Sequence, residues 1–267
     1  MTKLIAEIGW NHMGNMNLAK KMILEAKKNG ADLVKTQVFN TKYLKKGPWD
    51  KDGRTQIYKK AELNLEKYNE LFNYSKKIDT VFFASAMDIH DAELISKVSN
   101  NLIKIPSMES RNIHLIQYCN KKFRKVIMSS GTSTFKELIK STSRMNPKKF
   151  IIMHCVSSYP CEFSNINLPK IKFLKKYFSK VGFSDHTLGI KASTISLQYY
   201  PDYIEKHFTI DRKLPGRDNA FAILPKELKE LKEFIKIYSE TNTNHGKNYL
   251  NCEKEARKVY SGRWQKK

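Results

Sequence analysis

The sequence predicts a single-domain (β/α)8 TIM barrel, and three observations lead to this prediction. Short β-rich runs alternate with amphipathic helical stretches along the 267 residues, eight such runs are present, and no Ser/Gly linker or low-complexity segment divides the chain. Strands that alternate with helices imply parallel pairing through right-handed crossovers. We favour a closed barrel over an open doubly wound sheet, because closure removes both edges and eight units fit this length.

The expected strands are short apolar runs bounded by polar or turn-forming residues. They span residues 3–8, 32–38, 80–85, 102–105, 125–129, 150–156, 181–183 and 203–207. The expected helices carry apolar residues three and four positions apart. They span residues 18–28, 65–77, 91–98, 113–120, 135–143, 168–178, 189–199 and 226–238. The barrel should therefore occupy residues 1–240, followed by a short basic C-terminal tail at 241–267.

The segment between the second strand and the following helix, residues 40–62, is long for a loop of this type. It follows the carboxyl end of its strand, which is the face where barrel enzymes build their active sites. We expect it to act as a lid or as a substrate loop.

Composition excludes several classes of protein. Hydrophobic residues make up 40% of the chain and aromatics 11%, which excludes disorder, and no apolar run approaches the roughly 20 residues that span a bilayer. The chain enters a strand at Lys3, which leaves no room for a signal peptide, so we expect a soluble, cytoplasmic protein without a membrane partner. The cysteines, at 119, 155, 161 and 252, form no CxxC pair, and we expect free thiols.

The formal net charge of +23 is open to two interpretations. A basic protein can bind nucleic acid or other anions, but here the lysines form pairs scattered over nearly every expected helix instead of one stripe with interleaved aromatics. We interpret them as solvated helix faces and expect no nucleic-acid partner.

Polar side chains recur at the carboxyl ends of the expected strands. Lysine is seldom buried unless it is paired, so Lys35 and Lys104, at inward-facing strand positions, predict an anionic ligand. Serine hydroxyls can hydrogen-bond phosphate or carboxylate oxygens, although any single one of them can equally be a turn former. The strand-end serines are Ser107, Ser129, Ser157 and Ser184.

Two histidines predict a metal site. His186 and His207 lie at consecutive strand ends, where two imidazoles can share one divalent cation and leave positions open for water or substrate. Asp185 and Glu205 stand alongside and favour this interpretation. His154 sits further inside its strand, and we assign it a structural role.

The chain resembles the N-acetylneuraminate (sialic acid) synthase family over nearly its whole length. Each matching motif is weak alone, but the order and spacing are specific. The motifs are AEIG at residues 6–9, NH at 11–12, SSYP at 157–160, GFSDHTLG at 182–189, EKHFT at 205–209 and LPGRD at 214–218. The resemblance implies a (β/α)8 barrel that condenses phosphoenolpyruvate with an N-acylated amino sugar such as N-acetylmannosamine.

The resemblance also implies roles for particular residues. Lys35, Lys104 and the four serines, Ser107, Ser129, Ser157 and Ser184, are expected to hold phosphoenolpyruvate, and His186 and His207 to bind Mn²⁺ or Mg²⁺. The metal polarises the aldehyde of the open-chain sugar for attack by C3 of phosphoenolpyruvate. Catalytic Glu109 is expected to manage the water that adds at C2. The expected sugar-side contacts are Glu7, Tyr159 and Asp218.

Two features depart from the family pattern. Family members usually continue into an antifreeze-like domain that covers the partner subunit's barrel, whereas this sequence ends in a short basic tail. We expect a separate antifreeze-like protein in trans or the 40–62 segment to close the site, or a different acceptor, and we expect any homodimer to rest on barrel surfaces. Residues 84–88 read ASAMD where the family has Ser-Thr-Pro-Phe, so one hydroxyl contact is missing.

Three alternatives stay open. A legionaminate or pseudaminate synthase would use a differently substituted sugar. A synthase of a 3-deoxy sugar acid phosphate would need basic residues for the acceptor's phosphate, for which Arg212, Lys213 and Arg217 are candidates. A catalytically silent basic binding barrel would release no phosphate from phosphoenolpyruvate.

Overall fold

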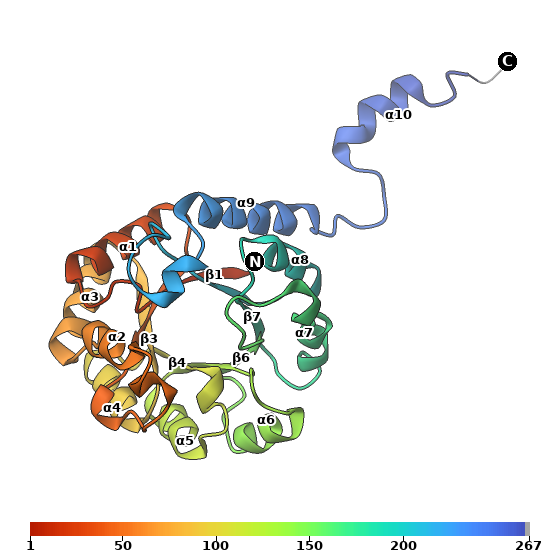
Figure 1. The fold of residues 1–267 in the computed structure, drawn as a ribbon. Coiled ribbons are helices and arrows are strands. Elements are labelled where there is room, and N and C mark those ends of the chain that lie inside the picture. The colour runs from red at the N-terminus through yellow and green to blue at the C-terminus, as the bar shows by residue number, and fades with distance from the viewer. Residues whose placement is uncertain (265–267) are drawn as a thin grey trace.

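The computed structural model describes residues 1–264 and contains a closed barrel of eight parallel strands in chain order (Figure 1). The predicted fold class is therefore confirmed. The last three residues of the expected tail, 265–267, lie outside the described residues. The strands are β1 (Lys3–Gly9), β2 (Leu33–Val38), β3 (Val81–Ala86), β4 (Leu102–Ile105), β5 (Lys125–Ser129), β6 (Phe150–Cys155), β7 (Val181–Asp185) and β8 (Tyr203–His207).

Helices surround the barrel, and one stands away from it (Figure 1). The outer ring is formed by α1 (Met16–Lys28), α3 (Leu65–Lys77), α4 (Ile89–Val98), α5 (Ile113–Lys122), α6 (Phe135–Thr142), α7 (Pro169–Leu174), α8 (Lys191–Ser196) and α9 (Pro225–Thr241). A further helix, α2 (Arg54–Ala61), lies within the expected 40–62 loop. In the tail, α10 (Lys254–Tyr260) is exposed along its whole length and projects from the barrel.

Polar caps start several of these helices. Asn15, Asn64 and Asn112 each accept a hydrogen bond from the backbone N–H three residues ahead, at the starts of α1, α3 and α5. Thr134 and Glu137 form a capping box at the start of α6. Such a cap stabilises a helix by about 1 kcal/mol. The helices expected at 168–178 and 189–199 are shorter in the structure. The first ends at Leu174 and continues as turns. The second becomes a 3-10 turn that ends at Tyr200, which has a left-handed backbone conformation (φ 52°).

Side chains alternate between the barrel interior and the helix layer. An apolar layer fills the lower interior, and its members are Ile5, Leu33, Phe83, Ile127, Ile151, Met153 and Tyr203. Residues two positions further along these strands face the same interior. They form a polar layer above the apolar one, and this layer includes Glu7, Lys35, Ser129, Cys155 and Glu205. The strand residues of opposite parity pack on the surrounding helices in one large apolar cluster.

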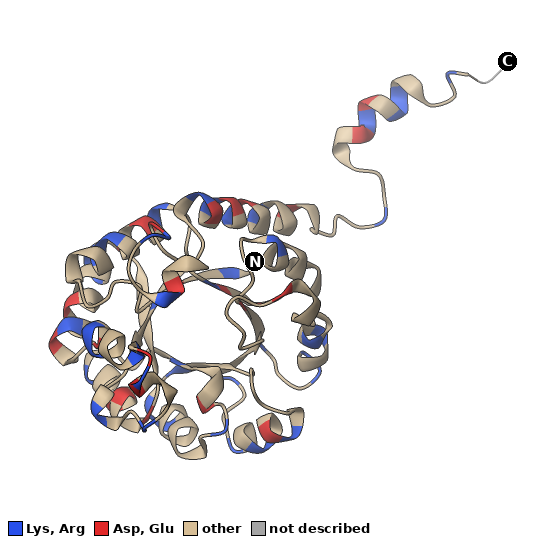
Figure 2. Ribbon diagram, viewed as in Figure 1, with Lys and Arg blue, Asp and Glu red and all other residues tan. Residues whose placement is uncertain are grey.

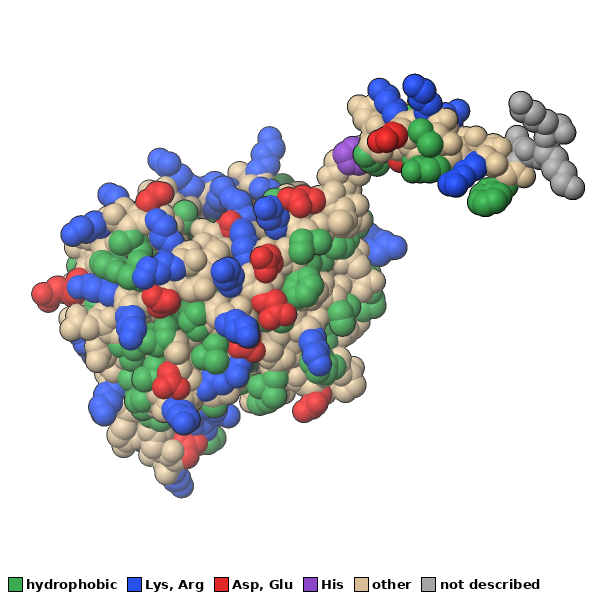
Figure 3. All heavy atoms as spheres, turned by 90° about the horizontal axis from the view of Figure 1, so that it is seen from above, with side chains coloured by type: hydrophobic (Ala, Val, Ile, Leu, Met, Phe, Trp, Pro, Cys, Tyr) green, Lys and Arg blue, Asp and Glu red, His purple; other side chains and the backbone are tan. Residues whose placement is uncertain are grey.

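The surface charge is dispersed over the helices. Lysine and arginine occur on nearly every helix of the ring (Figure 2), and on the face drawn in Figure 3 they alternate with acidic and apolar side chains. On that face the basic residues do not gather into one stripe. Within residues 1–264, no helix has the length and apolar character needed to cross a bilayer.

His154 faces the helix layer, in agreement with a structural role. Its Nε2 donates to the Ile166 carbonyl at 2.6 Å, and its ring stacks on Phe183. Burial lowers the pKa of this imidazole to about 4.

This burial predicts a pH effect on stability. Between pH 6.5 and about pH 4, His154 is protonated in the unfolded chain but neutral in the folded chain. The free energy of unfolding should therefore decrease as the pH is lowered through this range. Replacement by Gln (His154→Gln) should flatten the fall by roughly 2 kcal/mol between pH 7 and pH 4.5, as measured by urea denaturation. Exposed His114→Gln is the control, and equal slopes in the two variants would contradict the prediction.

Candidate active site

Two ion pairs occupy the polar layer inside the barrel. Lys35 Nζ lies 2.7 Å from Glu7 Oε2, and Lys104 Nζ lies 2.8 and 2.9 Å from the two carboxylate oxygens of Glu205. Lys35 Nζ is also 3.8 Å from Glu205 Oε1, which joins the pairs. Strand register explains the first pair, because Glu7 stands opposite Lys35. Both lysines point inward as expected, but the anions they contact here are carboxylates of the chain itself.

Burial and charge compete at these four groups. Burial raises the pKa of Glu7, against the attraction of Lys35. At Glu205 burial acts the same way, but Lys104 and Lys35 outweigh it and lower the pKa of that carboxyl to about 2. Burial lowers the pKa of Lys104 despite Glu205, whereas for Lys35 the two carboxylates overcome burial and raise the pKa. The two positive and two negative groups balance, which is the condition for burying them together.

The four predicted serines line the same region. Ser184 Oγ donates to Glu205 Oε1 at 3.0 Å, and Ser129 is buried at the end of β5. Ser157 Oγ is buried and has no hydrogen-bond partner among the described residues. A Cβ added to Gly131 would lie 2.5 Å from Ser157 Oγ and 2.6 Å from Ser107 Oγ. Glycine at this position therefore leaves open the space that both hydroxyls face.

A buried thiol links the serines to the histidines. Ser107 Oγ donates to Cys155 Sγ at 3.3 Å, and the same sulfur lies 3.8 Å from His186 Nδ1. Burial acts to raise the pKa of Cys155, but His186 outweighs it and the pKa falls to about 7. The sequence analysis did not assign Cys155 to the site. Its position two residues after Met153, at the end of β6, could have indicated that it faces the barrel interior.

The two predicted metal ligands lie side by side, with ring centroids 5.5 Å apart. His186 Nδ1 donates to the Val156 carbonyl at 2.8 Å, so in the neutral ring Nε2 is the nitrogen free to bind a metal. Burial acts to lower the pKa of His186, but Cys155 and the Val156 carbonyl outweigh it and raise the pKa. His207 Nδ1 is buried without a hydrogen-bond partner among the described residues. Burial, with His186 next, holds the pKa of His207 well below its ordinary value, so this ring stays neutral.

These two imidazoles fit a divalent cation as a pair of ligands. Within residues 1–264, no three His, Cys, Asp or Glu side chains form a cluster with metal-binding geometry. Water or substrate must therefore complete the coordination of any ion held here, which is the arrangement of a catalytic metal site. Asp185, expected beside the histidines, faces away from them, because alternate strand residues point to opposite sides. It accepts from Ser193 Oγ at 2.6 Å and pairs with Lys206 at 3.3 Å.

Aromatic and acidic side chains complete the mouth of the barrel. The Tyr159 ring packs 4.2 Å from His186 and 6.1 Å from His207, centroid to centroid. Asp218 belongs to a 3-10 turn, η6 (Arg217–Ala220), and its Oδ2 lies 3.5 Å from His207 Nδ1. The indole N–H of Trp10 donates to the same oxygen. Sequence reasoning gave Trp10 no role, because nothing local connects it to Asp218.

Glu109 stands apart from the ion pairs. It ends the 3-10 turn η3 (Ser107–Glu109) after β4, is half-buried, and accepts a hydrogen bond from Asn112 Nδ2 at 2.9 Å. Asn112 also caps α5. The structure thus places this carboxylate two residues after Ser107, and among residues 1–264 it forms no hydrogen bond or ion pair with the site's lysines or histidines.

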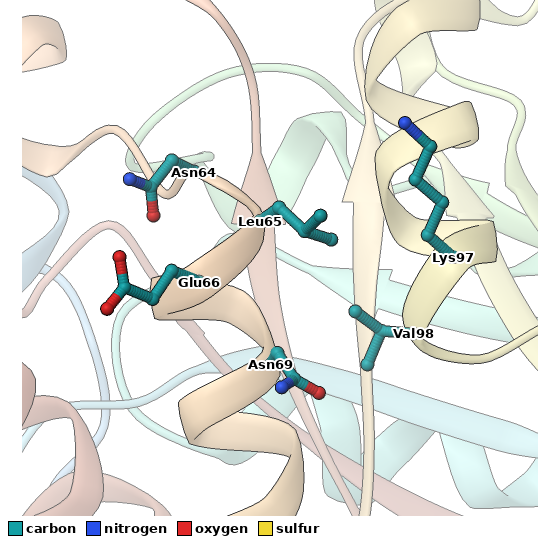
Figure 4. Close-up of a pocket in the computed structure, with 6 residues that line it drawn as sticks. All are labelled: Asn64, Leu65, Glu66, Asn69, Lys97 and Val98. Atoms are coloured by element: carbon teal, nitrogen blue, oxygen red, sulfur yellow. The ribbon is translucent and has the colours of Figure 1, made fainter.

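Surface hollows lie elsewhere. One lies between α3 and α4 and is lined by Asn64, Leu65, Glu66, Asn69, Lys97 and Val98 (Figure 4). A single carboxylate and a single ammonium line this hollow, without histidine or cysteine. The chemically equipped region is therefore the carboxyl end of the barrel.

Comparison with known proteins points to one family. The profile of the NeuB family matches residues 22–247. The chain is 34% identical to the N,N'-diacetyllegionaminic acid synthase of Campylobacter jejuni, over 86% of this chain and 74% of that protein. It is 31% identical to human N-acetylneuraminate-9-phosphate synthase, over 94% of this chain and 74% of that protein.

A solved structure gives the same result. The N-acetylneuraminic acid synthetase of Leptospira borgpetersenii, crystallised in complex with citrate, superposes with a TM-score of 0.87 at 31% identity. The match covers 97% of this chain and 92% of that one.

The ion-paired layer predicts a stability effect. Glu205→Gln leaves Lys104 buried without its carboxylate and should lower the free energy of unfolding at pH 7 by about 3 kcal/mol, measured by urea denaturation. Because the folded pKa of Glu205 is depressed to about 2, the stabilisation is complete above pH 4.5 and is lost as the pH falls toward 2. The deficit should therefore shrink in acid. Exposed Glu240→Gln is the control; a deficit equal to the control's would refute the prediction.

Proposed function

The chain belongs to the NeuB family, and from this premise we propose that it catalyses metal-dependent condensation of phosphoenolpyruvate with N-acetylmannosamine or a related N-acylated amino sugar. The products are a sialic-acid-type nonulosonate and phosphate. One observation carries the proposal: two buried, ion-paired lysines stand beside a pair of adjacent histidines at the carboxyl end of one barrel. This arrangement supports an anion site next to a cation site.

Phosphoenolpyruvate is proposed to bind at the lysine layer. Lys35 and Lys104 supply point charges, and the hydroxyls of Ser107, Ser129, Ser157 and Ser184 supply donors for phosphate and carboxylate oxygens. The unpartnered Ser157 Oγ and the space at Gly131 support this assignment, because both are explained by a ligand between Ser157 and Ser107. An entering anion competes with Glu7 and Glu205 for the two ammonium groups.

The two histidines, His186 and His207, are proposed to hold Mn²⁺ or Mg²⁺. When bound, such an ion polarises the aldehyde oxygen of the open-chain sugar. The Val156 carbonyl orients His186 and fixes its tautomer, and burial keeps His207 neutral. His207 is therefore ready to bind without first losing a proton, whereas His186, whose pKa is raised by Cys155 against the effect of burial, gives up any proton at Nε2 when the ion binds.

The remaining residues are proposed to act on the water that adds at C2 and on the acceptor sugar. C3 of phosphoenolpyruvate attacks the aldehyde carbon, the π bond of the aldehyde breaks so that its oxygen takes up a proton and becomes a hydroxyl, and positive charge develops at C2. Water adds at C2 and gives its proton to Glu109, which Asn112 orients, and cleavage of the C2–O bond releases phosphate. Glu7, Tyr159 and Asp218 are assigned to the sugar side, where Tyr159 packs on the histidines.

The acceptor is proposed to be an unphosphorylated sugar. Of the three basic residues considered for an acceptor phosphate, Arg212 is bound elsewhere: its Nε donates to the Ala222 carbonyl, and its guanidinium pairs with Glu227. This contact occupies one of the three basic groups that a synthase of a 3-deoxy sugar acid phosphate would need, and Lys213 and Arg217 keep that alternative open. The 2,4-diacetamido sugars of legionaminate and pseudaminate synthesis remain alternatives to N-acetylmannosamine, since synthases of both kinds are among the relatives. Because the relatives are named synthases, the silent binding barrel is set aside.

Assembly and location also belong to the proposal. We assign the protein to the cytoplasm, in keeping with four free cysteines. A homodimer through barrel surfaces, with the mouth closed by the 40–62 segment or by an antifreeze-like protein in trans, fits a barrel whose mouth carries the site.

Turnover should depend on both a metal ion and an amino sugar. Phosphate release from phosphoenolpyruvate should require Mn²⁺ or Mg²⁺ and one of N-acetylmannosamine or the 2,4-diacetamido sugars, and should stop when the metal is chelated. Loss of one ligand in His207→Ala should lower kcat/KM by about 100-fold or more, while exposed His114→Ala should match wild type. Metal-independent release, or no release with any of these sugars, would contradict the proposal.

Turnover should also depend on Glu109. The variant Glu109→Gln retains an acceptor for Asn112 but cannot take the proton of water, so kcat should fall by roughly 100-fold or more at unchanged melting temperature. Steady-state phosphate release measures the effect, with exposed Glu93→Gln as control. Normal turnover in the Glu109 variant would remove this residue from the mechanism.

A further inference from the structure

We propose that Trp10 is a positioning residue for the acceptor sugar: its indole N–H holds the Asp218 carboxylate in place, and its ring is held by Tyr58 of α2. The inference rests on the proposed function, because it assigns Asp218 to the sugar side of the site. It extends that function to a residue that lies between the AEIG motif at 6–9 and the NH motif at 11–12 and belongs to neither.

The contact between Trp10 and Asp218 fixes a loop carboxylate at the mouth. Trp10 follows β1 directly, and its Nε1 lies 2.5 Å from Asp218 Oδ2. The same oxygen is 3.5 Å from His207 Nδ1. Among the described residues, Asp218 accepts no other side-chain hydrogen bond, so the indole is the one neutral donor that orients it. With Oδ2 engaged, Oδ1 remains to accept from a sugar hydroxyl.

The contact between Trp10 and Tyr58 brings in the 40–62 segment. The two rings stack with centroids 4.8 Å apart and planes 24° apart, and Phe39 stands nearly edge-on to both at 6.5 and 6.1 Å. Helix α2 buries only Ala61, and a helix of eight residues is unstable alone. It therefore depends on such contacts for its place, and the aromatic stack couples its position to Trp10.

These two contacts form one connection from the segment to the site. Tyr58 holds the indole ring, the indole N–H holds Asp218, and Asp218 lies against His207. A group that orients a substrate must be held closely, since small misplacements cost large factors in rate. Loss of either contact should weaken use of the sugar and leave the lysine layer, and hence phosphoenolpyruvate, unaffected.

Two variants separate the halves of this connection. Trp10→Phe keeps a ring for Tyr58 but removes the N–H, and Tyr58→Leu keeps the N–H but removes the stack. Each should raise the sugar KM by about 10-fold, with the KM for phosphoenolpyruvate within about 2-fold of wild type and the melting temperature unchanged. The matched control is Trp49→Phe, because the Trp49 Nε1 donates to the Lys45 carbonyl within the segment and not to Asp218.

A second measurement needs no turnover. The segment contains exposed lysines, including Lys45, Lys46 and Lys51, where trypsin can cut. Tyr58→Leu should speed tryptic cleavage there severalfold, whereas Trp10→Phe should cleave at the wild-type rate because the stack remains. The control for this measurement is Tyr177→Leu, which removes an exposed aromatic ring outside the 40–62 segment.

The outcomes distinguish the inference from the proposed function. A wild-type chain that releases no phosphate with any amino sugar contradicts the proposed function. A wild-type chain that turns over, with a Trp10→Phe variant whose sugar KM is unchanged, overturns the inference alone. Equal increases in both KM values, or a lowered melting temperature, would show a general structural role for Trp10 and would also overturn it.

Discussion

The structure depends on a buried balance of charge. Lys35 and Lys104 lie inside the barrel, where an unpaired ammonium group would be strongly destabilising, and Glu7 and Glu205 compensate them at 2.7 to 2.9 Å. The apolar layer beneath, with Ile5 and Phe83 among its members, excludes water from below. The barrel can therefore present two strong cationic groups to a ligand from one side only.

The two ends of the site differ in what supports them. The proposed anion end consists largely of strand residues, among them Lys35, Lys104 and Ser184, and these strands are hydrogen-bonded on both sides in the closed barrel. The sugar end is built from segments that follow the strands, such as the turn with Asp218 and the helix with Tyr58. This division agrees with relatives that share the barrel but differ in the sugar acid they make, because loops can change without disturbing the strand framework.

Much of the fold could be predicted, and the reasons are local. Each strand is a short apolar run, and each inward position follows from alternation, so the direction of Lys35 and Lys104 was found from parity. The two histidines were found from their place at consecutive strand ends. Applied to Asp185, the alternation rule predicts that its side chain faces away from the histidines, as the structure shows. Helix α2 was missed because its sequence is polar and buries one residue, which leaves little periodic signal.

The sequence by itself determined the number and order of the strands, the polar layer at their carboxyl ends and the family, because these are properties of alternation, composition and motif order. Only the tertiary structure decided which groups meet. Lys104 and Glu205 are 101 residues apart and Trp10 and Asp218 are 208 apart, yet each pair is in contact. Barrel closure brings the first strand beside the last and sets the register between them, and no local pattern encodes that register.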